Sequence, residues 1–197
     1  MDHLFEKGKN QPEAWLTTST SLRKAADILF SHCPEGWGSD GEPREPDKLF
    51  VLAPASMLYG FAMENAIKGY LIIQHGGFDA AFAANNAAWK GHHLRELAIA
   101  TGMALSEEQK RLLPTVDALI CWAGRYPVSL ARKGFTLKEQ LNAGDESPPI
   151  LLDKVQRDIL DPLYKALTKA LHNNLIARLS QRDLPPTIAT TSALPGT

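Results

Sequence analysis

The sequence predicts an all-α protein, an antiparallel helical bundle of about five main helices with long loop insertions. Apolar residues recur at helical spacing in several long segments, and no stretch shows the sustained period-two alternation of a strand between turn signals. The connections between these segments differ widely in length, which argues against a symmetric up-and-down bundle and for a helical core that carries loops.

The composition fits a single globular domain. A chain of 197 residues that is 44% hydrophobic can bury a substantial core, and we expect residues 1–178 to form one helical domain. Residues 179–197 contain turn formers and small polar residues, so we expect a disordered tail there. The 21 basic and 22 acidic side chains give a formal net charge of -1, so any binding to nucleic acid or lipid needs a local patch.

The setting suggested by the sequence is the cytoplasm. Cys33 and Cys121 lie far apart and fit no metal or redox spacing, as expected for two thiols in a reducing compartment. The N-terminal stretch is polar and acidic, without the apolar region of an export signal, and the longest apolar runs are too short to span a bilayer. We therefore expect no contact with a membrane.

Two long helices open the chain. The first runs from Pro12 to about His32, and the second runs from Pro54 to about Gln74, where Gly76 and Gly77 stop it. The second helix has apolar residues on both sides and is therefore the expected central helix of the bundle. The loop between these helices, residues 33–49, is dense in Gly, Pro and acidic residues and is long enough to be functional.

Shorter elements follow. Residues 78–91 fit either a short Ala-rich helix or a flexible lobe, and a short helix over "HHLRELAIATG" should end at Gly102. Ser106 and Gln109 match a capping box that starts the next helix, which runs to about Ala123. A long helix then begins near Leu152, and the Asp-Pro pair at 161–162 either bends or restarts it.

Glu64 and Lys68 stand in the middle of the central helix. They are four residues apart with the acid first, which is the favoured order for a helical ion pair. Because their neighbours are apolar, a charge there is costly unless a partner satisfies it. The pair is therefore either a structural lock or part of a binding site.

His92 and His93 lie at the start of a predicted helix. Adjacent helical residues point about 100° apart, so one imidazole should face the bundle and the other water, and the sequence does not decide which. A zinc site needs further ligands at compatible spacing, and "HHLRE" lacks the H-E-x-x-H order. We expect no metal and no cofactor, and the alternative to a site is a histidine that braces the helix.

Arg125 and Tyr126 form the third candidate. Gly124 should end the preceding helix and Pro127 prevents its continuation, so the corner presents a guanidinium and a phenol beside the bundle end. Such a pair suits a phosphate or a carboxylate. The alternative is that Arg125 pairs with a bundle carboxylate such as Glu64 while Tyr126 packs.

Sequence motifs of several enzyme classes are absent. The chain contains no P-loop, no G-x-G-x-x-G, no G-x-S-x-G and no C-x-x-C, and no E-x-x-H of the kind that builds di-iron sites in helical bundles. A nucleophile-triad enzyme and an oxygen-activating bundle are therefore unsupported.

Between Pro12 and Asn174 the order of elements resembles HEPN domains, the nucleotide-binding helical bundles of higher eukaryotes and prokaryotes. The stretches "MENAIKGYLI" and "GHHLRELA", with the corner "WAGRYPV", carry the resemblance. The resemblance implies a bundle that is usually dimeric, in a family of toxin and defence ribonucleases and non-catalytic binding members. Catalytic members carry an Arg followed four to six residues later by a His, and this sequence has no such pair.

The sequence therefore predicts a divergent HEPN-like module that binds a nucleotide, RNA or a protein partner, in a toxin-antitoxin or defence system, as a homodimer. The sequence leaves open whether the protein catalyses a reaction, and on balance we expect that it does not. The expected ligand contacts are Glu64, Lys68, His92, His93, Arg125 and Tyr126. One alternative is a metal-independent ribonuclease that uses His92 or His93 with Arg125 as base and cation. The other alternative is a structural helical subunit.

Overall fold

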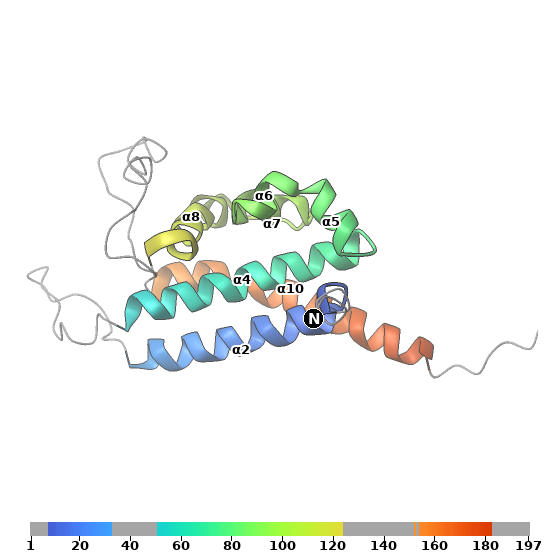
Figure 1. Cartoon of the computed structure of the whole chain (residues 1–197). Helices are drawn as coiled ribbons and strands as arrows, with labels where there is room; N and C mark the ends of the chain where they lie inside the picture. Colours follow the sequence, from blue (N-terminus) through green and yellow to red (C-terminus); the bar gives the residue numbers. More distant parts are fainter. Residues whose placement is uncertain (1–7, 33–50, 124–151, 153, 183–197) are drawn as a thin grey trace, which may run out of the picture.

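A computed structural model of the chain describes residues 8–32, 51–123, 152 and 154–182, and Figure 1 shows their arrangement. Every regular element in these residues is helical, which confirms the predicted all-α class. In chain order the elements are α2 (Pro12–Ser31), α4 (Leu52–Gln74), α5 (Phe78–Ala84), α6 (Asn86–Lys90), α7 (Leu94–Ala100), α8 (Glu107–Ala118), the π-helical turn η1 (Leu119–Ala123) and α10 (Lys154–Arg182).

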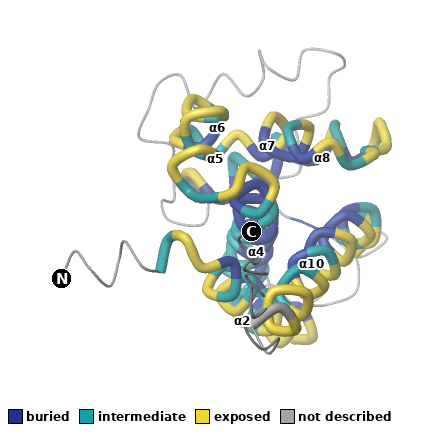
Figure 2. The backbone as a smooth tube through the Cα atoms, turned by 90° about the vertical axis from the view of Figure 1, so that its right-hand side faces the viewer, coloured by how far each residue is buried: buried dark blue, intermediate teal, exposed yellow. Residues whose placement is uncertain are grey.

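Helix α4 lies at the centre of the molecule, as its two apolar sides predict. Helices α2 and α10 pack on one side of it, and α5 to α8 form a layer on the other side (Figures 1 and 2). The side chains of α4 that are withdrawn from water include Tyr59, Met63, Ile67 and Leu71, each at most 1% exposed. Glu64 and Lys68, in the middle of this helix, are therefore held inside the protein.

Two glycines of α4, Gly60 and Gly69, allow close approach of the neighbouring helices. A Cβ atom at Gly60 would lie 2.8 Å from Cγ1 of Ile120, and a Cβ atom at Gly69 would lie 2.9 Å from Cβ of Trp15. Real Cβ contacts are essentially never this short, so a side chain at either position would push a packed neighbour away. Both glycines thus set how closely α2 and η1 pack on α4.

Asp161 of α10 joins three helices, through an ion pair with Arg23 of α2 and a hydrogen bond from Tyr59 of α4. The guanidinium of Arg23 donates to both carboxylate oxygens of Asp161, at 2.7 and 3.1 Å, and the hydroxyl of Tyr59 donates to Asp161 Oδ1 at 2.9 Å. Arg23 also lies over the rings of Tyr59 and Tyr164. Burial acts to raise the pKa of Asp161, but the hydrogen bonds from Arg23 and Tyr59 outweigh it, so the net pKa is lowered.

Helix boundaries differ from expectation at three places. Helix α4 begins at Leu52, so Pro54 lies inside its first turn, and residues 78–91 contain two short helices, α5 and α6. Helix α10 runs through Pro162 without restarting and continues to Arg182, past residue 178, where we expected the domain to end. The expected loop at 33–49 and the tail beyond residue 182 lie outside the described residues.

Helix α8 begins with the predicted capping box. The backbone N–H of Gln109 donates to Ser106 Oγ at 3.1 Å, and the backbone N–H of Ser106 donates to the side-chain oxygen of Gln109 at 3.0 Å. Among the described helices, none combines the length and the apolar character needed to cross a membrane.

Candidate functional site

Glu64 and Lys68 form a buried ion pair inside α4. Glu64 is 4% and Lys68 7% exposed, and the ammonium nitrogen of Lys68 lies 2.5 Å from Glu64 Oε1. Lys68 also donates to the backbone oxygen of Trp89 at 3.2 Å and lies over its indole ring, 5.0 Å from the centroid. The predicted i,i+4 pair is therefore present, and Lys68 is satisfied by partners within the protein.

His92 joins this pair from the turn between α6 and α7. Its Nδ1 atom lies 2.8 Å from Glu64 Oε1, so the imidazole that faces the bundle is that of His92. The side chain of His92 is nevertheless 38% exposed. We name Glu64, Lys68 and His92 the α4 cluster.

The backbone of His92 adopts an unusual conformation that brings its ring to Glu64. Its φ angle is +56°, and His92 is the one non-glycine residue with a positive φ among those the structure describes. Such a conformation costs on the order of 1 kcal/mol or more for a residue with a side chain. Strain of this kind persists where surrounding contacts hold it, and here the contact is the bond to a buried carboxylate.

The geometry of the α4 cluster fixes the roles of the two imidazole nitrogens. An ionised carboxylate only accepts hydrogen bonds, so the Nδ1 atom that faces Glu64 must carry a hydrogen. The other nitrogen, Nε2, is then available to accept a proton or, when the ring is protonated, to donate one. An imidazole oriented in this way can contact a phosphate or act as a general base.

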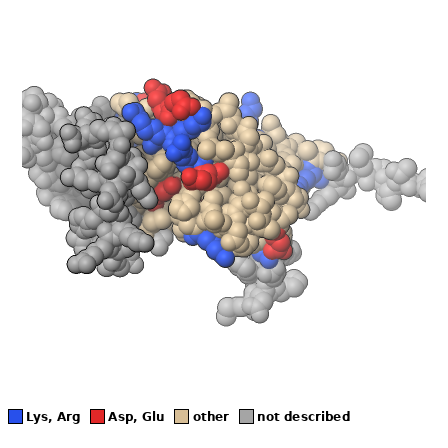
Figure 3. Space-filling view, turned by 90° about the horizontal axis from the view of Figure 1, so that it is seen from above, with Lys and Arg blue, Asp and Glu red and all other residues tan. Residues whose placement is uncertain are grey.

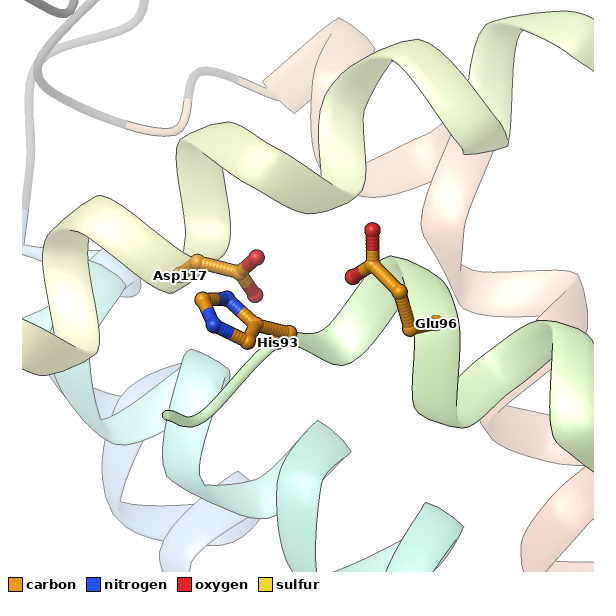
Figure 4. Close-up of side chains that lie close together, drawn as sticks. All are labelled: His93, Glu96 and Asp117. Atoms are coloured by element: carbon orange, nitrogen blue, oxygen red, sulfur yellow. The ribbon is translucent and has the colours of Figure 1, made fainter. Parts of the chain in front are cut away.

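His93 belongs to a second group. It precedes α7, Glu96 lies in the first turn of α7, and Asp117 lies in the last turn of α8 (Figure 4). One side-chain ligand atom from each of the three lies within 4.8 Å of the others. Figure 4 shows the imidazole beside the Asp117 carboxylate, with Glu96 turned toward the same space. We name His93, Glu96 and Asp117 the α7–α8 cluster.

Asp117 is the most deeply placed member of the α7–α8 cluster. Burial raises its pKa to about 7, and the nearby charges of Glu96 and Glu64 act in the same direction. The backbone N–H of Leu94 donates to Asp117 Oδ1 at 2.8 Å, which opposes the rise and caps the start of α7.

Charge on the outer face of the α5–α8 layer is local and mixed. Figure 3, which views this face, shows lysine and arginine side chains gathered next to aspartate and glutamate, while much of the remaining surface is uncharged. A face of this kind provides no extended basic field among the described residues. A phosphate-bearing ligand would therefore depend on a few specific contacts.

A surface pocket is lined in part by Trp15 and Phe78, the rings of which contact that of Trp89. Its volume is about 340 Å³, and its lining is mainly apolar: Gly8, Lys9, Ala14, Trp15, Thr18, Asn65 and Phe78. Asn65 donates to the backbone oxygen of Phe61 at 2.8 Å. Trp89 links the pocket to the α4 cluster, because its ring contacts Trp15 and Phe78 as well as Lys68.

The structure thus brings three of the predicted site residues together, namely Glu64, Lys68 and His92. His93 lies in the neighbouring cluster, and Arg125 and Tyr126 lie outside the described residues. Sequence reasoning did not single out Glu96 or Asp117. Glu96 follows His93 by three residues, and this spacing could have indicated that the two side chains lie close together. Asp117 could not have been found in this way, because its approach depends on how α7 packs against α8.

Comparisons with protein-family models, with curated proteins and with solved structures found no match for this chain.

Proposed function

We propose that this chain is a HEPN-like binding module for a phosphate-bearing ligand, a nucleotide or single-stranded RNA, and that His92 is its contact residue. The observation that carries the proposal is the imidazole of His92, held by buried Glu64 at 2.8 Å and still 38% exposed. Of the α4 cluster, His92 is the member that a ligand can reach.

The charges of the α4 cluster favour an anionic ligand. Glu64 and Lys68 neutralise each other, so a protonated His92 adds a positive charge that the pair does not cancel. The Nε2–H of such a ring is a charged donor, and charged donors bind phosphate oxygens with short, strong hydrogen bonds. The buried pair then serves to hold the ring in place.

One contact also favours a second candidate function, a metal-independent ribonuclease. A histidine oriented by a carboxylate is the arrangement of a general base, and Glu64 and His92 have it. RNA cleavage further needs a cation for the charge that develops on phosphorus, for which the sequence offers Arg125. The missing Arg-x4-6-His pair places this candidate second.

The test is retention and cleavage of a labelled single-stranded RNA pool and of labelled ATP, in EDTA and across a salt series. We expect retention without cleavage, with affinity that falls as salt rises, because phosphate contacts release counterions. His92→Ala should lose most of the retention, and His172→Ala, at an exposed position on α10, should bind as the wild type does. Cleavage lost in His92→Ala would favour the ribonuclease, and retention equal in both variants would refute the role of His92.

We also propose, from the resemblance, a homodimer that works in the cytoplasm. The C-terminal part of α10 extends beyond the other helices in Figure 1, and Ile176 and Leu179 on it are each 50% exposed. These two side chains lie three residues apart and so on one face of the helix, and we propose that the second chain covers them. Sedimentation equilibrium should give twice the mass of one chain, and a single-chain mass over the whole concentration range would contradict the dimer.

A further inference from the structure

The α7–α8 cluster brings three different metal-binding side chains to one place outside the α4 cluster. His93 supplies an imidazole nitrogen, and Glu96 and Asp117 each supply a carboxylate oxygen, all within 4.8 Å of one another. We propose that these three residues bind one divalent transition-metal ion of the zinc type. The proposed function does not depend on this ion, because its test is carried out in EDTA.

The donor set indicates the class of ion. Magnesium and calcium are bound by oxygen ligands, whereas one nitrogen with two oxygens is typical of zinc and its first-row neighbours. Three protein ligands would leave a fourth position for water, as in zinc sites with an open coordination position. The proposed site is therefore one for an exchangeable ion at the surface rather than a closed structural site.

The distances require only small adjustment. Ligand atoms about 2.1 Å from a tetrahedral zinc ion lie roughly 3.3 Å from one another. The present separations are all within 4.8 Å, and the two residues that must move, His93 and Glu96, are exposed. His93 is the residue directly before α7 and Glu96 lies in the first turn of α7, so both ligands come from the start of that helix.

The third ligand is already oriented. The backbone N–H of Leu94 holds Asp117 Oδ1 at 2.8 Å, which leaves Oδ2 for an ion. Partners of this kind orient ligating carboxylates in metal sites. Because Leu94 follows His93 directly in sequence, the same hydrogen bond fixes the start of α7 against the end of α8.

Gly91 provides room for the imidazole. A Cβ atom at this position would lie 2.4 Å from Nε2 of His93, so the ring could not occupy its place if residue 91 had a side chain. Since Nε2 lies against Gly91, the other ring nitrogen, Nδ1, is the one left for a ligand. The observed position of the His93 ring therefore requires a glycine at residue 91.

The electrostatics of the cluster also favour a cation. Glu96 and Asp117 place a carboxylate oxygen each within 4.8 Å of one another. Two negative charges this close repel each other, and a divalent cation bound between them offsets that repulsion.

The experiment uses full-length protein without a histidine tag, stripped with EDTA and dialysed. Zn²⁺ is titrated by calorimetry and Co²⁺ by its visible absorption, with Asp117→Asn and Glu96→Gln as test variants. Glu108→Gln, an exposed acid in the first turn of α8 outside the cluster, is the matched control. Asparagine keeps an oxygen for the Leu94 N–H, and circular dichroism of each metal-free variant checks its fold.

We expect saturable binding of one ion per chain, weakened at least roughly tenfold in each test variant and unchanged in the control. Co²⁺ should give the absorption of a site with nitrogen and oxygen ligands, and excess Mg²⁺ should not displace Zn²⁺. The absence of saturable binding, equal binding in all variants, or displacement by Mg²⁺ would each overturn the proposal. If Asp117→Asn fails to fold, Glu96→Gln, at an exposed position, still decides it.

Discussion

Replacing Glu64 by glutamine should destabilise the protein strongly. Glutamine has nearly the same size and keeps an acceptor oxygen, but the ammonium group of Lys68 then has no negative partner. The side chain of Lys68 is 9% exposed, so water cannot compensate the lost charge. The remaining contacts of Lys68 are the backbone oxygen of Trp89 at 3.2 Å and the face of its ring.

Removing one partner of a buried ion pair costs about 3–5 kcal/mol of unfolding free energy, and we expect the lower end because glutamine still accepts a hydrogen bond. In a domain of this size, about 3 kcal/mol corresponds to a fall in melting temperature of roughly 6–12 °C. Urea unfolding followed by circular dichroism measures the change. The double variant Glu64→Gln/Lys68→Met removes both charges and should recover most of the loss.

The matched control is Glu107→Gln. Glu107 pairs with Lys110 at 2.7 Å on the surface, with an 87% exposed side chain, and its loss should leave stability essentially unchanged. If Glu64→Gln were as stable as this control, the pair inside α4 would not behave as a buried pair. If the double variant were less stable than Glu64→Gln, the reasoning from an unpaired charge would fail.

Three further predictions concern the fold. Gly69→Ala should lower the free energy of unfolding, measured in urea, by about 1 kcal/mol. The new Cβ atom meets Trp15 Cβ at 2.9 Å, and this clash outweighs the gain in helix propensity. A variant more stable than the wild type would contradict this prediction. Ser106→Ala should cost about 1 kcal/mol by losing the capping box, with an unchanged melting curve as the contrary result. Asp161 has a lowered pKa in the folded protein, so its stabilisation is present above the unfolded pKa of about 3.9 and is lost as the pH falls. Asp161→Asn should therefore flatten the acid side of the stability curve between about pH 5 and 3, and an equally steep curve would refute this.

Local features of the fold could be predicted from sequence. The i,i+4 pair of Glu64 and Lys68 and the capping box of Ser106 depend on residues within one helical turn, and both are present. The central place of α4 followed from its lack of a polar face. Pro162 was harder to interpret, because a proline that follows aspartate suits a new helix start and a continuous helix alike, and here α10 continues.

Contacts across the fold could not be predicted. That His92 faces Glu64 depends on the positive φ at His92, which is rare outside glycine and has no sequence signature there. The pair of Arg23 and Asp161 could not be predicted, because the two residues are 138 positions apart and lie in different helices. Their meeting depends on how α2 and α10 pack against α4, which local patterns do not encode.

The central claim, that His92 is oriented by Glu64 and contacts a phosphate-bearing ligand through Nε2, is tested most directly by long-range proton–nitrogen NMR of the histidine rings. Resonances are assigned with His92→Gln and His93→Gln and followed as a single-stranded RNA oligonucleotide is added in EDTA. We predict that Nδ1 of His92 carries the hydrogen in the free protein and that the Nε2 resonance of His92 moves on binding while that of exposed His172 does not. An oligonucleotide that leaves the His92 resonances unchanged would contradict the account.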